Sequence, residues 1–215
     1  MSEKGIRIFM AILGVTICGI SVGLFKLSLF GTDPFQCFVA GIYNLTGDKF
    51  SVSFGTLYMC LNLLMLIIIF ILDKHYIGIA TFINIFLLGY LVDFTIAILT
   101  PVFGNAGLLT RIILLVLGIV IMCFASSLYF TANLGVSTYD AVALIMTDKK
   151  IGKFQYCRIG ADLFCVIIGF VLKAAIGVGT LVTAFFMGPL IEWFNVHFSR
   201  PFLEKWAGEQ LPQDK

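Results

Sequence analysis

Charged residues are scarce in this chain. Lys, Arg, Asp and Glu make up 12% of its 215 residues, whereas hydrophobic residues make up 60%. A soluble globular domain has roughly a quarter of its residues charged. The formal net charge is only +2 and no basic run is long enough to follow a phosphate backbone. Composition therefore excludes a soluble domain and gives no reason to expect a nucleic-acid partner.

Residues that bind metals or act as nucleophiles are few or scattered. The two histidines, His75 and His197, stand apart, and no H-E-x-x-H motif accompanies them. No C-x-x-C pair is present among the six cysteines, which lie in apolar segments and which we interpret as small buried hydrophobic side chains. We therefore expect no metal and no cofactor, and we do not expect an enzyme.

What the chain does contain is a series of long apolar runs. A helix needs about 20 mainly apolar residues to cross ~30 Å of hydrocarbon. Six runs approach that length: Ile8–Leu24, Phe54–Leu72, Ile77–Leu99, Ile112–Phe130, Ile159–Leu172 and Ile176–Phe194. We predict an all-α polytopic protein of the lipid bilayer. The first run resembles a signal peptide, but no small-x-small cleavage site followed by a soluble domain comes after it, so we expect it to be retained.

The chain also repeats itself. Arg7–Gly31 aligns without a gap on Arg111–Gly135, and Ile77–Phe94 aligns on Ile176–Trp193. Identical pairs include Arg7/Arg111, Gly14/Gly118, Gly31/Gly135, Gly78/Gly177 and Thr81/Thr180. Chance matching among Leu, Ile and Gly explains scattered identities, but explains poorly two ungapped blocks in the same order that include charged positions. Two homologous halves are an architecture that many membrane transporters use.

Each half is predicted to contain a long helix, a short helix and two further spans. Repeat 1 covers residues 5–99 and repeat 2 covers residues 109–198, within a single transmembrane domain, and residues 199–215 form a short cytoplasmic tail. The predicted helices cover residues 6–30, 34–45, 53–72 and 77–98, then residues 110–133, 138–147, 154–173 and 176–197. Polar breaks at residues 46–49 and 147–150 follow the short helices.

The two short helices have well-defined starts. Asp33 supplies an N-cap carboxylate before Pro34, and Ser137 or Thr138 can cap the second helix. As a helix, residues 34–47 would be about 21 Å long, which is less than the hydrocarbon thickness. We therefore favour a half-inserted helix in each half, with neighbouring helices or water satisfying its backbone.

The number of spans decides the symmetry of the repeat. Three full spans in each half give six spans and an inverted repeat, which helix length favours. Four give eight spans and a parallel repeat, which is the alternative. The distribution of Lys and Arg places both termini in the cytoplasm in either case and does not choose between them.

Several motifs resemble the YczE/YyaS/YitT group of bacterial integral membrane proteins. The first half carries Gly31-Thr32-Asp33-Pro34-Phe35, Ser53-Phe54-Gly55-Thr56 and Ile77-Gly78-Ile79-Ala80-Thr81 leading to Asn84 and Gly89. The second half carries the motifs Leu134–Asp140 and Ile176–Thr180, with Gly188-Pro189. The resemblance covers about residues 5–198 and implies a multi-pass protein of the bacterial cytoplasmic membrane. Ala80 departs from the family's second glycine, and Gln36 stands where an acidic residue is common.

Polar side chains inside lipid are costly, so each is a candidate functional residue. The substrate-binding candidates are Asp33, Gln36, Ser137 and Asp140 at the short-helix starts, and the matched pair Asn84 and Thr183 in the last spans. Helix N-termini can hold an anion or a polar ligand. The alternatives are simple capping by Asp33 and Ser137, and hydrogen bonding between helices by Asn84 and Thr183.

Three further acids and one arginine lie in predicted spans. Asp93 and Glu192 occupy matched positions, and they are candidates for proton or cation coupling or, alternatively, interface residues. Arg158 precedes Asp162 by one helical turn, which favours a structural ion pair over a substrate or proton relay.

These features favour a small-solute transporter or permease, with its substrate bound between the repeats near the short-helix N-termini. The alternative is a non-transporting accessory protein that binds a protein partner or lipid through its glycine-rich faces. An intramembrane enzyme using a carboxylate pair is the weakest hypothesis. The partners considered are the bilayer, a small-molecule substrate and a second copy in a homo-oligomer. Because matched positions differ in chemistry, one shared central site is expected.

Overall fold

The computed structural model describes residues 3–31, 33–50, 54–104, 106–174 and 176–207, and every regular element within them is helical. The all-α prediction is therefore confirmed for this part of the chain. The elements are α1 (Glu3–Ser28), α2 (Pro34–Phe50), α3 (Phe54–Asp73), the 3-10 turn η1 (Lys74–Tyr76), α4 (Ile79–Phe103), α5 (Leu108–Ala132), α6 (Thr138–Asp148), α7 (Phe154–Val171), α8 (Val178–Phe194), the π-helical turn η2 (Asn195–Ser199) and α9 (Arg200–Ala207).

Five helical stretches are long and apolar enough to cross a membrane. They are Lys4–Ser28, Thr56–Tyr76, Leu108–Ala132, Phe154–Val171 and Val178–Trp206. A sixth span is obtained if α4 counts as one, because its parts Ile79–Leu88 and Tyr90–Phe103 meet at 43°. The short helices α2 and α6 do not meet this criterion. The molecule is thus a multi-span membrane protein with five or six apolar spans.

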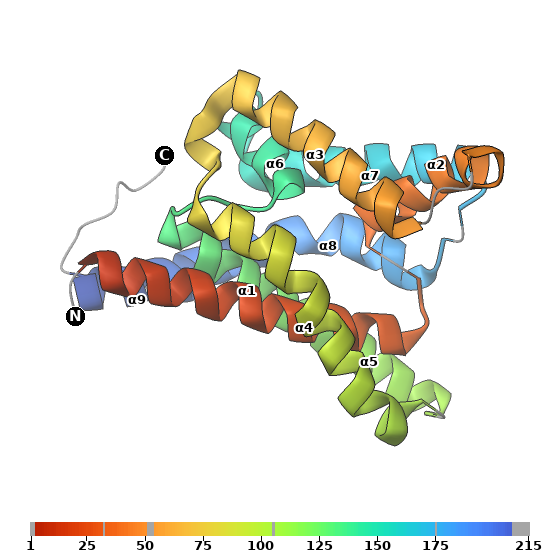
Figure 1. Ribbon diagram of the computed structural model, residues 1–215. Coiled ribbons are helices and arrows are strands. Elements are labelled where there is room, and N and C mark those ends of the chain that lie inside the picture. Colours follow the sequence, from red (N-terminus) through yellow and green to blue (C-terminus); the bar gives the residue numbers. More distant parts are fainter. Residues whose placement is uncertain (1–2, 32, 51–53, 105, 175, 208–215) are drawn as a thin grey trace.

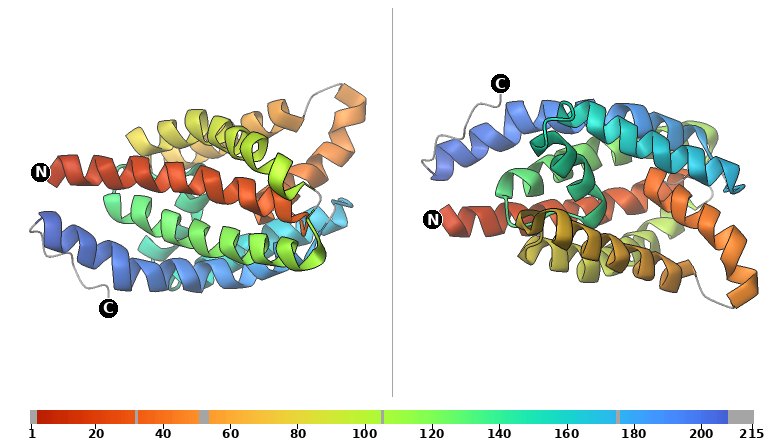
Figure 2. Two further views of the ribbon diagram at one scale, coloured as in Figure 1. Left: turned by 90° about the horizontal axis from the view of Figure 1, so that it is seen from below. Right: turned by 90° about the horizontal axis from the view of Figure 1, so that it is seen from above.

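Two predicted boundaries differ from the structure. The polar break expected at residues 46–49 is helical, and α2 continues to Phe50. The Thr46 hydroxyl donates to the Ile42 carbonyl (2.8 Å), and the Asn44 amide donates to the Lys173 carbonyl (2.9 Å), which attaches the helix to the end of α7. The tail begins with α9, whose Leu203 is fully buried against α1. The helix α9 and the start of α1 therefore lie at the same end of the molecule (Figure 2).

The helices α1 and α5 run antiparallel through the centre of the molecule (Figure 2). A Cβ atom on Gly14 would lie 2.9 Å from the Ala125 carbonyl oxygen, and one on Gly118 would lie 3.3 Å from the Ser21 carbonyl oxygen. Gly118 is the repeat counterpart of Gly14, and Ala125 is that of Ser21. The same close contact is therefore made twice, in opposite directions.

The turns that follow α1 and α5 each contain a glycine in the left-handed region of backbone conformation. The φ angles are +118° at Gly31 and +98° at Gly135. Glycine adopts such angles without the steric cost that a side chain would add. Each turn redirects the chain from the end of a long helix into a short helix.

Each of these turns also packs against the opposite half. The Gly179 amide donates to the Phe30 carbonyl at 2.9 Å, and the Ala80 amide donates to the Leu134 carbonyl at 2.9 Å. Ala80 and Gly179 are repeat counterparts, as are Phe30 and Leu134. The two halves therefore exchange equivalent backbone contacts at the starts of α4 and α8.

The short helix α6 begins beside the middle of α3 and ends beside η1. At its start, the Thr138 hydroxyl donates to the Asn62 side-chain oxygen at 2.8 Å. At its end, the Tyr76 hydroxyl donates to Asp148. The helix α6 therefore runs along the second half of α3.

The other short helix, α2, runs along the second half of α7 (Figure 1). Phe35 packs with Cys165, and Asn44 reaches the carbonyl of Lys173 just beyond the end of α7. At the starts of the short helices, the rings of Phe35 and Tyr139 stack with their centroids 5.1 Å apart. Both short helices thus begin near the centre of the bundle.

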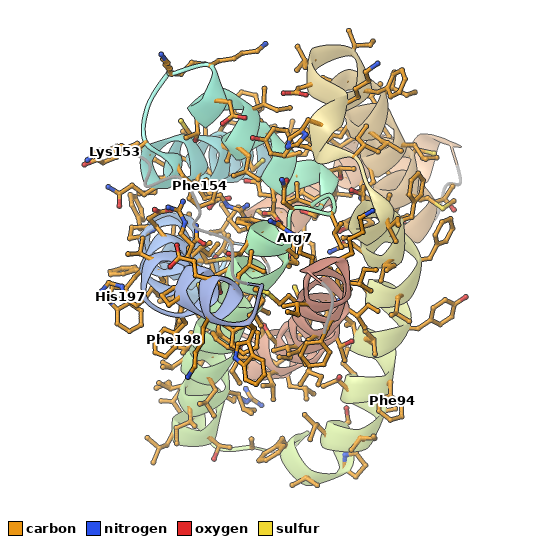
Figure 3. The ribbon with its side chains drawn as sticks, turned by 90° about the vertical axis from the view of Figure 1, so that its left-hand side faces the viewer. Arg7, Phe94, Lys153, Phe154, His197 and Phe198 are labelled. Atoms are coloured by element: carbon orange, nitrogen blue, oxygen red, sulfur yellow. The ribbon has the colours of Figure 1, made fainter. Side chains whose placement is uncertain are left out.

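Equivalent helix pairs in the two halves pack differently. The helix α7 packs on α8, where a Cβ atom on Gly188 would lie 2.9 Å from the Gln155 carbonyl oxygen. In contrast, α3 and α4 diverge from η1 (Figure 1). Viewed from the end where α1 begins, Arg7 lies among the helices, whereas Phe94 and His197 lie on opposite outer sides (Figure 3).

Candidate functional site

A cavity of about 420 Å³ lies where the two short helices begin. Both halves line it: α1, α2, α3 and α4 from the first, and α5, α6, α7 and α8 from the second. Its charged lining residues are Lys26, Asp33, Asp140 and Arg158, and its amide residues are Gln36, Asn62 and Asn84. Its size falls within the range of roughly 300–1,000 Å³ that is typical of small-molecule pockets.

Arg158 holds together a buried network of hydrogen bonds and ion pairs. Its guanidinium donates to the Asp140 carboxylate and, through Nε, to Asp162 at 3.2 Å. The exposed fractions of Arg158, Asp140 and Asp162 are 5%, 6% and 0%. The Tyr129 hydroxyl donates to Asp140, and the Tyr139 hydroxyl donates to Asp162. Both carboxylates are therefore surrounded by donors.

Sequence spacing pointed to the pair of Arg158 and Asp162, which lie on neighbouring turns of α7. It did not point to the contact between Arg158 and Asp140, since 18 residues separate them and α6 must fold against α7 to bring them together. The contact of the Arg158 guanidinium with the face of the Tyr139 ring, 4.7 Å from its centroid, was missed for the same reason.

Asp33 and Ser137 both cap the short helices. The Gln36 amide N–H donates to Asp33 Oδ1 at 2.9 Å, and the Asp140 amide N–H donates to the Ser137 hydroxyl oxygen at 3.1 Å. The Ser137 hydroxyl in turn donates to Asp140 Oδ2 at 2.6 Å. A carboxylate is therefore present in the first turn of each helix, where it offsets the helix dipole.

Some polar groups of the cavity wall are open to a ligand. Among the described residues, no hydrogen-bond partner is found for the side-chain amides of Gln36 and Asn84, and Asn84 is only 9% exposed. Within the same part of the chain, no ion pair joins Asp33 to Lys26 or to another basic residue. These four side chains can change partners without breaking the Arg158 network.

Three predicted candidates are not brought into the described cavity wall. Thr183 is buried in α8, with its hydroxyl 3.0 Å from the Gly179 carbonyl oxygen and 2.9 Å from that of Thr180. Glu192 lies on α8 away from the cavity lining. The side chain of Asp93 lies outside the described residues. The predicted site residues that do line the cavity are Asp33, Gln36, Asn84, Ser137 and Asp140.

A bundle of apolar helices around a central polar cavity defines a polytopic membrane protein with an internal binding site. The chain belongs to DUF6198, a family of unknown function whose model matches residues 5–196. No solved structure matches the chain.

Three similar proteins come from two bacteria. An uncharacterized protein of Haemophilus influenzae is 26% identical over 188 residues, covering 85% of this chain and 80% of that protein. The uncharacterized protein YyaS of Bacillus subtilis is 23% identical over 193 residues, covering 90% and 94%. The uncharacterized membrane protein YczE of B. subtilis is 25% identical over 181 residues, covering 84% and 77%. The predicted resemblance to the YczE/YyaS group is thus confirmed.

Proposed function

We propose that the protein is a transporter of a small solute, which binds in the central cavity between the two halves. The observation that carries this proposal is the cavity of about 420 Å³, whose wall combines residues of both halves. Charged and amide groups are costly inside a membrane protein unless they are paired or functional. The Arg158 network is paired, but the Asn84 amide is buried without a partner among the described residues. A ligand-binding role accounts for it.

We also infer that the two halves form an inverted repeat with six spans, counting the bent α4 as one. The antiparallel packing of α1 and α5 supports this arrangement, because a parallel repeat would make these equivalent helices parallel. The central starts of α2 and α6 support it further. Repeat-related halves around a central site, with helix N-termini at that site, are common in secondary transporters.

Cysteine labelling tests the inverted repeat. In a variant without the six native cysteines, we expect a cysteine at position 49 to react with an impermeant maleimide added to intact cells. A cysteine at position 149, after the second short helix, should react only once the membrane is opened, because inversion places equivalent positions on opposite faces. Labelling of both positions from one side would contradict the inversion and support a parallel repeat.

The matched residues Asn84 and Thr183 test the cavity as the binding site. In proteoliposomes supplied with a transported solute, Asn84→Leu should lower uptake about 10-fold, which corresponds to the loss of one buried hydrogen bond of ~1.4 kcal/mol. Thr183→Val should change uptake less than about two-fold, because that hydroxyl bonds only within its own helix. Equal effects of the two substitutions would argue against binding in this cavity.

An accessory role is the second candidate, and the exposed face of α3 favours it. Large apolar side chains lie open along this helix, among them Ile67 (57%), Phe70 (61%) and Ile71 (76%). Lipid covers such faces in membrane proteins, so the cavity is the stronger observation. Co-purification of a defined partner that contacts α3, combined with a lack of solute uptake in proteoliposomes, would support the accessory role.

A further inference from the structure

We propose that the solute is a small organic cation, such as an amine, a quaternary ammonium compound or a guanidine, whose positive charge binds beside Asp33. This inference rests on the proposed function and specifies its substrate class. It is carried by the charges of the cavity wall, by the state of the short-helix N-termini and by the difference between the two halves.

The hydrogen bonds around the cavity indicate ionised carboxylates. Asp140 accepts from the hydroxyls of Ser137 and Tyr129 and from Arg158. Asp162, directly behind the cavity wall, accepts from the Tyr139 hydroxyl and from Arg158. Ionised carboxylates act only as acceptors, and here each is supplied with donors.

The charges of this region do not balance. Arg158 is shared between Asp140 and Asp162, so the network of one cation and two anions has a net charge of −1. Asp33 adds a second uncompensated negative charge. Lys26 returns one positive charge, but it lies exposed at the end of α1. Charges interact more strongly in a low-dielectric cavity than in water, so the excess negative charge favours a cation.

The short-helix N-termini do not offer a free anion site. Asp33 accepts the backbone N–H of Gln36, and Ser137 accepts that of Asp140. Asp33 and Asp140 also place negative charge where an anionic ligand would have to approach. The sequence-based expectation of an anion or polar-ligand site is thereby narrowed to solutes without negative charge.

The second half shows how the cavity accommodates a cation. There, the Arg158 guanidinium lies beside Asp140 and 4.7 Å from the centroid of the Tyr139 ring. In the first half, the repeat counterpart of Tyr139 is Phe35, and a carboxylate is again nearby in Asp33. The position that aligns with Arg158 is occupied by Tyr58, whose ring lies 5.6 Å from that of Phe35. Carboxylate and aromatic rings are therefore present without a protein cation.

The unpartnered amides complete such a site. Asn84 and Gln36 both line the cavity, and each side chain offers a carbonyl oxygen. These oxygens can accept N–H groups from an ammonium or guanidinium ion. Aromatic faces attract the same cations by about 0.5–2 kcal/mol. One carboxylate, two amide oxygens and the rings of Phe35 and Tyr58 therefore match an organic cation.

The test uses four solutes of similar size on the purified full-length protein: n-butylammonium, choline, butanoate and butanamide. A ligand that binds the folded state raises the midpoint of thermal unfolding, so n-butylammonium or choline should raise it, whereas butanoate and butanamide should not. Asp33→Asn should weaken cation binding at least about 10-fold. Lys26→Gln should strengthen it roughly two-fold or more, because it removes a like charge. A purely structural role would not give effects of opposite sign.

Each other outcome overturns the inference in a recognisable way. If the cations act equally on Asp33→Asn, or if only butanoate or butanamide binds, then the substrate is not a cation recognised by Asp33. If uptake is found only for an anionic or uncharged solute, the inference also fails while the proposed transport function stands. If no solute of any class is bound or taken up, the proposed function fails with it.

Discussion

Replacement of Arg158 by leucine is expected to lower the free energy of unfolding by about 3–5 kcal/mol. The substitution leaves two carboxylates, on Asp140 and Asp162, buried without their shared cation. The hydroxyl donors Tyr129 and Tyr139 remain, but they carry no charge. The measurement is chemical or thermal unfolding of the purified protein in detergent, together with the yield of folded protein.

Two control variants separate the loss of charge from the loss of packing. Arg158→Lys keeps the charge but cannot reach both carboxylates with a planar guanidinium, so its effect should be intermediate. The triple variant Arg158→Leu, Asp140→Asn, Asp162→Asn removes the unpaired charges and should recover much of the lost stability. If Arg158→Leu were as stable as the unchanged protein, the network would not be the structural centre described above.

Replacement of Gly177 by alanine is expected to destabilise the protein by about 3 kcal/mol or more. A Cβ atom at this position would lie 1.8 Å from the carbonyl oxygen of Phe30. The obstacle is backbone, so no side-chain rotation relieves it, and the hydrogen bond from Gly179 to Phe30 (2.9 Å) must break. Unfolding in detergent measures the effect.

The chain contains matched controls for this prediction. Gly78, the repeat counterpart, would place a Cβ atom 2.1 Å from the Leu134 carbonyl oxygen, so Gly78→Ala should be destabilising to a similar extent. At Gly160, within α7, a Cβ atom would meet no described neighbour within 4 Å, so Gly160→Ala should be neutral or stabilising by up to about 1 kcal/mol. If all three variants were equally stable, the exchanged contacts between the halves would contribute little.

Features that depend on neighbouring residues could be predicted from the sequence. Asp33 and Ser137 cap their helices as local turn chemistry allows, and the spacing of Arg158 and Asp162 fits one helix face. The long apolar runs likewise indicated the helices. Local spacing and hydrophobicity are sufficient for such features because they involve one element at a time.

Features that depend on packing between distant elements could not be predicted. Asn84 and Thr183 align in the repeat, yet Asn84 lines the cavity and Thr183 bonds to its own helix. The alignment cannot distinguish them, since it carries no information on how far apart α3 and α4 lie relative to α7 and α8. The ion pair between Asp140 and Arg158 was missed because it requires the relative placement of α6 and α7.

The unlike packing of the two equivalent helix pairs has a consequence for movement. One pair, α7 and α8, is closed around Gly188, whereas the other pair, α3 and α4, is spread apart. If the pairs exchanged these arrangements, the central cavity would lose one entrance and gain another on the opposite side. Such an exchange trades contacts of one kind for equivalent contacts, so the two forms would differ little in free energy. A difference of about 1.4 kcal/mol would still leave roughly a tenth of the molecules in the less favoured form.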